Sequence, residues 1–81
     1  MKILYVEDDV IALSYVDKVL RSQYEIDTAF NASIALDLAN KNKYEVMLLD
    51  INLGKGIDGV ELMQMMRKIE GYSKIPMIAV T

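Results

Sequence analysis

The sequence predicts an α/β domain in which four strands alternate with three helices in the order βαβαβαβ. Four short apolar runs are separated by stretches whose apolar residues recur at helical spacing. Connections of this length between apolar strands favour right-handed crossovers between parallel neighbours. At 81 residues the chain has room for one domain at most. We therefore expect a parallel sheet with helices on both faces.

The first predicted strand is followed almost directly by a helix. Residues 2–6, KILYV, are apolar and rich in β-branched and aromatic side chains, which is typical of a strand buried on both faces. From Val10 to Ser22 the apolar spacing becomes helical, and Asp8 or Asp9 stands where an N-cap is needed. The side chains expected to face the sheet are Ala12, Val16, Val19 and Leu20.

The second strand and helix are more polar than the first pair. Residues 24–30, YEIDTAF, alternate in polarity, which favours an edge strand or a strand with one exposed face. Asn31 can cap the helix that follows. The inward stripe of that helix is predicted to comprise Ala32, Ala35, Leu36 and Ala39.

The third strand is predicted to be central, because residues 45–50, EVMLLD, form a continuous apolar run before the final aspartate. A third helix should open at Gly59, since Asp58 and Glu61 have the spacing of a capping box. We interpret Asp58 as a cap for this reason. The side chains expected to face inward are Val60, Met63, Met66 and Ile69.

The last part of the sequence predicts the end of the third helix and a fourth strand. Gly71 can end the helix, and residues 75–81, IPMIAVT, form the final apolar run. The methionines at 63, 65 and 66 are interpreted as core filling, because flexible thioether side chains suit irregular gaps.

Composition excludes several classes of function. Nine basic and twelve acidic residues give a net charge of −3, with no basic run that could follow a phosphate backbone, so nucleic acid is not expected as a partner. The absence of Cys and His removes disulfides, thiolate zinc sites and imidazole chemistry, and it favours the cytoplasm slightly. The first apolar run is too short for a signal peptide or a membrane span.

Acidic side chains follow two of the predicted strands. Glu7, Asp8 and Asp9 come after the first strand and Asp50 ends the third, so all lie at the carboxyl edge of a parallel sheet, where ligands bind. Converging carboxylates repel unless a cation lies between them, and Mg²⁺ prefers such oxygen ligands. An Asp beside Mg²⁺ can attack phosphorus, and the Thr81 hydroxyl could bind a phosphoryl oxygen at the same edge.

Four segments of the chain together resemble the successive signatures of response-regulator receiver domains, the phosphoacceptor modules of two-component signalling. In chain order the segments read ILYVEDD, LLDINL, DGVEL and IPMIAVT. The resemblance covers the whole chain, and it implies a flavodoxin-like (CheY-like) sheet with strand order 2-1-3-4-5 and five helices.

The resemblance also implies roles for particular residues. Asp50 would be the phosphoacceptor that takes a phosphoryl group from a histidine kinase, and Glu7 and Asp8 would hold Mg²⁺ with it. Asn52 would offer its backbone carbonyl to the metal, and Thr81 would be the switch hydroxyl. Catalysis would be limited to the phosphorylation and dephosphorylation of the chain itself, so a dedicated enzyme is not expected.

The chain departs from the family at its end, because receiver domains continue into a fourth helix, a fifth strand with an essential lysine and a fifth helix. Lys55 does not replace that lysine by motif. We therefore expect residues 1–81 to form a single, incomplete receiver domain, truncated after its fourth strand. The fourth strand would then be an exposed edge beside an uncovered sheet face, so a homodimer or higher self-association is expected there.

Two other interpretations follow from the same residues. The chain could be a truncated or engineered receiver fragment that self-associates and has lost phosphorylation-driven switching. A flavodoxin-like nucleotide binder is disfavoured, because an acidic turn instead of a glycine-rich loop follows the first strand. Asp9 is interpreted as a cap or a solvated neighbour rather than a ligand.

Overall fold

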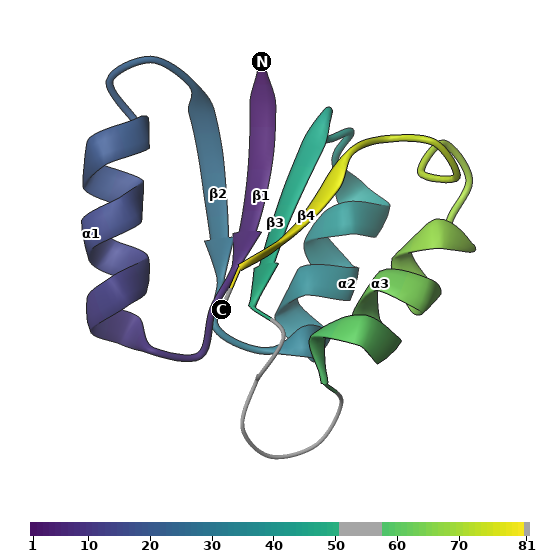
Figure 1. The fold of residues 1–81 in the computed structure, drawn as a ribbon. Helices are drawn as coiled ribbons and strands as arrows, with labels where there is room; N and C mark the ends of the chain where they lie inside the picture. The colour runs from purple at the N-terminus through teal and green to yellow at the C-terminus, as the bar shows by residue number, and fades with distance from the viewer. Residues whose placement is uncertain (51–57, 81) are drawn as a thin grey trace.

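The computed structural model describes residues 1–50 and 58–80, and these residues form the predicted alternation of strands and helices (Figure 1). In chain order the elements are β1 (Lys2–Val6), α1 (Val10–Leu20), β2 (Glu25–Ala29), α2 (Ala32–Lys41), β3 (Val46–Asp50), α3 (Gly59–Arg67) and β4 (Met77–Val80).

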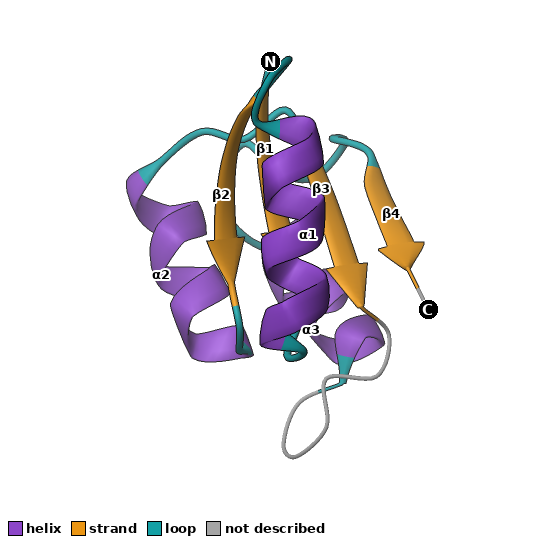
Figure 2. Cartoon of the chain, turned by 90° about the vertical axis from the view of Figure 1, so that its left-hand side faces the viewer, coloured by secondary structure: helices purple, strands orange, loops and turns teal. Residues whose placement is uncertain are grey.

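The four strands form one parallel sheet in the order β2-β1-β3-β4. Among the described strands, β2 and β4 are therefore the edges, and β1 and β3 are central, as the sequence predicts. The crossovers place α1 on one face of the sheet and place α2 and α3 on the other (Figures 1 and 2). The predicted CheY-like parallel sheet is confirmed.

The larger core cluster lies between the sheet and the pair α2 and α3. Alternate residues of the central strands point to this side, so Leu4, Val6, Met47 and Leu49 are fully buried there. Ala35 and Ala39 are the small α2 residues that let this helix approach the sheet closely. Every second side chain of β1 and β3 therefore packs in this core.

The remaining side chains of the sheet form a smaller cluster beneath α1. Ile3, Tyr5 and Ile26 are buried there, and α1 contributes the partly buried side chains Leu13, Val16 and Leu20. None of the residues of α1 is fully buried. This face of the sheet is therefore covered by a single helix, and only incompletely.

The predicted inward stripes of α1 and α3 are wrong at one position each. Val19 is 55% exposed and Val60 is 49% exposed. In α1 the spacing of Leu13, Val16 and Leu20 sets the buried face, which leaves Val19 on the flank. In α3, Leu62 is buried in the place that the prediction gave to Val60.

Helix starts agree with the sequence more closely than helix ends. The predicted N-caps are confirmed: the carboxylate of Asp9 accepts hydrogen bonds from two backbone N–H groups, and the side chains of Asn31 and Asp58 each accept one. Helix α1 ends at Leu20, two residues before the predicted end. Helix α3 ends at Arg67, and Gly71 instead takes a positive φ of 94° in the turn that follows.

One buried phenol ties the α2–β3 connection to the turn before β4. The Tyr72 hydroxyl lies 2.6 Å from the carbonyl oxygen of Asn42 and 2.9 Å from that of Ala39, and it accepts the backbone N–H of Tyr44 at 3.3 Å. Arg67 adds a second tie, because its Nη1 donates to the carbonyl of Ile75 at 2.6 Å. These contacts hold in place the segment that precedes β4, the strand at the edge of the sheet.

Candidate functional site at the carboxyl edge of the sheet

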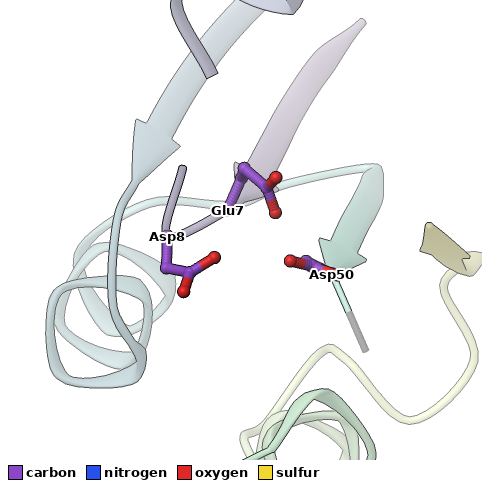
Figure 3. A group of neighbouring side chains, drawn as sticks. All are labelled: Glu7, Asp8 and Asp50. Carbon is purple, nitrogen blue, oxygen red and sulfur yellow. The ribbon is translucent and has the colours of Figure 1, made fainter. Parts of the chain in front are cut away.

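Three carboxylates meet where β1 and β3 end. These strands are parallel neighbours with Val6 opposite Leu49, so the residues that follow in register are Glu7 and Asp50. Glu7, Asp8 and Asp50 each offer a carboxylate oxygen, and these atoms all lie within 4.8 Å of one another. Figure 3 shows the three carboxylates turned toward one shared space at the sheet edge.

Local hydrogen bonds hold the residues on either side of Asp8. The backbone N–H of Glu7 donates to the carbonyl of Ala29 at 3.0 Å, which holds the start of the turn against the end of β2. Asp9 turns away to cap α1, with its Oδ1 accepting from the N–H of Ile11 at 3.0 Å. Asp8 remains between these two fixed points and is exposed, whereas Glu7 and Asp50 are half-buried.

The electrostatics of the site favour a proton or a cation. Burial, a hydrogen bond to Asp50 and the charges of Asp50, Asp8 and Asp9 raise the pKa of Glu7 from its ordinary value of 4.5 to about 7. A protonated Glu7 can donate to the Asp50 carboxylate. The cluster thus holds more negative charge than it can keep at neutral pH without a counterion.

Tyr5 is a neighbour of the site that the sequence interpretation missed. Its ring is buried beneath α1, and burial followed by the charges of Glu7, Asp50 and Asp9 raises the pKa of its phenol. The sequence could have indicated this neighbour, because side chains two residues apart along a strand point to the same face, and Tyr5 and Glu7 have this spacing.

The other predicted site residues have different outcomes. Asp9 is confirmed as a cap and lies outside the group of three. Asn52 and Thr81 lie outside the described residues, so their predicted roles stay predictions. The strand that leads to Thr81 does run to this edge, since Val80 pairs with Asp50.

The donor set of the cluster fits Mg²⁺. All three groups are carboxylates, which are hard oxygen ligands, and their oxygens are close enough to share one cation. Among the described residues no nitrogen or sulfur ligand joins this group, so the set favours magnesium over zinc or copper. A cation bound here would also relieve the repulsion that raises the pKa of Glu7.

Fold and site together define a parallel α/β protein with an acidic site at the carboxyl edge of its sheet. Comparison with known families gives a match to the response regulator receiver domain over residues 3–81. The chain belongs to this family.

Individual relatives agree with the family assignment. The chain is 36% identical over 80 residues to a probable transcriptional regulator, ycf29, of Porphyra purpurea, and 34% identical over 68 residues to the two-component response regulator ARR10 of Arabidopsis thaliana. These matches cover 98% and 80% of this chain. Among solved structures, the chemotaxis protein CheY4 of Vibrio cholerae superposes with a TM-score of 0.92 at 28% identity, over 96% of this chain.

The chain spans only part of these relatives. It corresponds to 38% of the Porphyra protein, 12% of the Arabidopsis protein and 65% of the CheY4 chain. None of the helices in the described part of the chain combines the length and apolar character that a membrane span requires.

Proposed function

We propose that this receiver domain, residues 1–81, accepts a phosphoryl group on Asp50 from a histidine kinase in the presence of Mg²⁺. The observation that carries the proposal is the convergence of Glu7, Asp8 and Asp50 within 4.8 Å at the carboxyl edge of the sheet. The absence of cysteine is consistent with a cytoplasmic setting, where such a kinase would present its phosphohistidine.

In this proposal Asp50 is the nucleophile. One of its carboxylate oxygens forms a bond to phosphorus as the phosphorus–nitrogen bond of the phosphohistidine breaks, and the imidazole leaves with the electron pair. Glu7, Asp8 and Asp50, with the backbone carbonyl of Asn52, would hold the metal. Bound Mg²⁺ supplies positive charge that stabilises the transferring phosphoryl oxygens. The Thr81 hydroxyl would then hydrogen-bond the phosphoryl group.

The direct test needs no knowledge of the natural kinase. We expect the intact mass of the chain to increase by one phosphoryl group after incubation with acetyl phosphate and Mg²⁺, with acetate as the leaving group. The Asp50→Ala variant should show no increase, because the nucleophile is gone.

The matched control is Asp37→Ala, which removes an exposed carboxylate that forms an ion pair with Lys41 on α2. This variant should be phosphorylated like the parent chain. Phosphate uptake by Asp50→Ala, or no uptake by the parent with Mg²⁺ bound, would contradict the assignment of Asp50.

The second candidate function is that of an assembly module with an inactive acidic site. One observation favours self-association: Ile78 of the edge strand β4 is 51% exposed. We propose that the chain forms a homodimer or a higher assembly through β4 or the sheet face beside it. Phosphate transfer to Asp50 separates the two candidates, because an assembly module need not accept phosphate.

A further inference from the structure

We propose that Arg67, the last residue of α3, is a positioning residue for phosphoryl transfer at the acidic site. It fixes the start of β4, and the other end of this strand pairs with Asp50. The inference rests on the proposed function, because it gives a role in that reaction to a side chain outside the site. Arg67 acts through the strand and not on the reacting atoms.

The guanidinium of Arg67 holds the turn that leads from α3 to β4. Its Nη1 donates to the carbonyl of Tyr72 at 3.2 Å and to the carbonyl of Ile75 at 2.6 Å. Hydrogen bonds from an ionised donor are shorter and stronger than neutral ones. None of the ion pairs among the described residues includes Arg67, so its charge is directed at main-chain carbonyls.

The turn needs such an anchor because it is long and irregular. Residues 68–76 join α3 to β4 and contain neither a helix nor a strand. Ordering such a segment costs conformational entropy, which its contacts must offset. The Tyr72 hydroxyl holds the middle of the turn against the carbonyl of Asn42, whereas Arg67 also reaches its end at Ile75.

The bond from Arg67 to Ile75 lies where the pairing of β4 with β3 begins. Ile75 directly precedes Pro76, and the carbonyl of Pro76 accepts the N–H of Met47 in β3 at 3.0 Å. Arg67 therefore holds the residue next to the first hydrogen bond between the two strands.

Strand β4 carries this fixed start to the acidic site. Figure 1 shows the turn after α3 at the end of the sheet opposite the one where the strands finish, and Val80, the last residue of β4, pairs with Asp50. A slip of two residues would keep every side chain on its face of the sheet. It would nevertheless move Val80 by about 6–7 Å along the strand. The residue after Val80 is Thr81, the proposed partner of the phosphoryl group.

The competing interpretation is that Arg67 serves only as a cation at the end of a helix. A positive charge in the last turn stabilises a helix through its dipole. Lys68, the next residue, is also cationic and is exposed. The hydrogen bonds of the described residues include two from Arg67 to the turn and none from the side chain of Lys68. Lys68 is therefore the matched control.

The test is the rate of phosphate uptake from acetyl phosphate with Mg²⁺, followed by intact mass well below the melting temperature. We expect Arg67→Met to slow uptake by at least about tenfold, because a misplacement of about 1 Å is enough for such a loss. Lys68→Met should keep the rate of the parent chain. Titration calorimetry should show an unchanged Mg²⁺ affinity, because β4 supplies none of the three carboxylates.

Amide hydrogen exchange provides a measurement that does not need the reaction. Hydrogen bonds alternate along a parallel pair, so the pairing that starts at Pro76 directs the N–H groups of Ile78 and Val80 toward β3. These two amides should exchange faster in Arg67→Met than in the parent chain or in Lys68→Met. The amides of β1 should keep their rates.

A double substitution tests the route by which Arg67 acts. If Arg67 places the end of β4, Arg67→Met should add little to the loss of rate caused by Thr81→Ala. Additive losses would show that Arg67 acts elsewhere, and they would overturn the inference.

The remaining outcomes separate this inference from the proposed function. The parent rate in Arg67→Met, or equal slowing in Lys68→Met, overturns the positioning role while Asp50 still accepts phosphate. If the parent chain takes up no phosphate, the proposed function fails and the role of Arg67 in the reaction fails with it. Circular dichroism verifies folding, and if Arg67→Met does not fold, Arg67→Gln, with a shorter and neutral polar side chain, replaces it in every comparison.

Discussion

Glu7 is a site residue whose chemistry differs from that of a free side chain. Its folded pKa of about 7 lies above the ordinary value of 4.5, so the native state holds a proton that the unfolded chain releases between these values. The stabilising contribution is fully present below about pH 4.5 and is lost as the pH rises through about 7. Because the chain contains no His or Cys, no side chain of those types titrates in the same window.

We therefore predict that, without divalent cations, the melting temperature of the chain falls as the pH is raised from about 5 to about 8. Glu7→Gln should flatten this profile, because the amide is neutral at every pH. Calorimetry with and without Mg²⁺ provides the measurement.

Magnesium should restore the melting temperature at the higher pH, since it binds the native carboxylates. The matched control is Glu45→Gln, which changes a glutamate that accepts a hydrogen bond from the backbone N–H of Lys2 at the far end of β1. It should keep the pH dependence of the parent. A flat profile in the parent chain would show that Glu7 titrates as it does in water.

At the scale of elements, stability depends on the contacts that hold the connecting turns between helices and strands in place. The turn between α3 and β4 is held by a buried phenol and by an arginine that donates to main-chain carbonyls. Because β4 is a four-residue edge strand, its position relies on these contacts as well as on its pairing with β3.

We predict that Tyr72→Phe lowers the free energy of unfolding by about 1–3 kcal/mol, because it leaves buried main-chain groups near Ala39 and Tyr44 without their partner. Urea denaturation measures the change. Tyr15→Phe, an exposed position with the same chemical change, should alter stability by less than about 0.5 kcal/mol. Equal effects of the two substitutions would show that the hydroxyl of Tyr72 contributes nothing.

At the scale of the whole molecule, the two faces of the sheet are unequally covered. Helices α2 and α3 both cover one face, whereas α1 alone lies over the other (Figures 1 and 2). Strand β4 links this asymmetry to the acidic site, because Ile78 lies on the open face and Val80 pairs with Asp50 two residues later. Strand β4 thus borders both the open face and the end of β3, which carries the proposed phosphoacceptor.

If the chain self-associates through β4 or the sheet face beside it, as the second candidate function proposes, thermal unfolding must also separate the copies. The melting temperature should then rise with protein concentration, because association stabilises the native state by mass action. Ile78→Glu should remove this dependence. The control Phe30→Glu changes an exposed side chain directly after the opposite edge strand β2, and it should keep the dependence. A melting temperature that is constant across concentrations in the parent chain would contradict the dimer.

Much of the fold was predictable because its signals are local. The apolar runs of β1 and β3, and the caps Asn31 and Asp58, depend on residues within a few positions of one another. Val19 and Val60 were misplaced for the opposite reason. Several faces of an amphipathic helix fit its apolar spacing, and only packing against the sheet selects one.

The sequence by itself determined the order of elements, the helix starts and the presence of acids at the ends of two strands, since periodicity and capping act over short distances. Only the tertiary structure brought Glu7 and Asp8 to Asp50 and decided that, of the two candidate caps Asp8 and Asp9, Asp9 is the one that caps α1. It also decided that the pKa of Glu7 is raised to about 7 and that the side chain of Ile78 is half-exposed. Those outcomes depend on which strands are neighbours and on what covers them, and both are set by contacts between residues far apart in the chain.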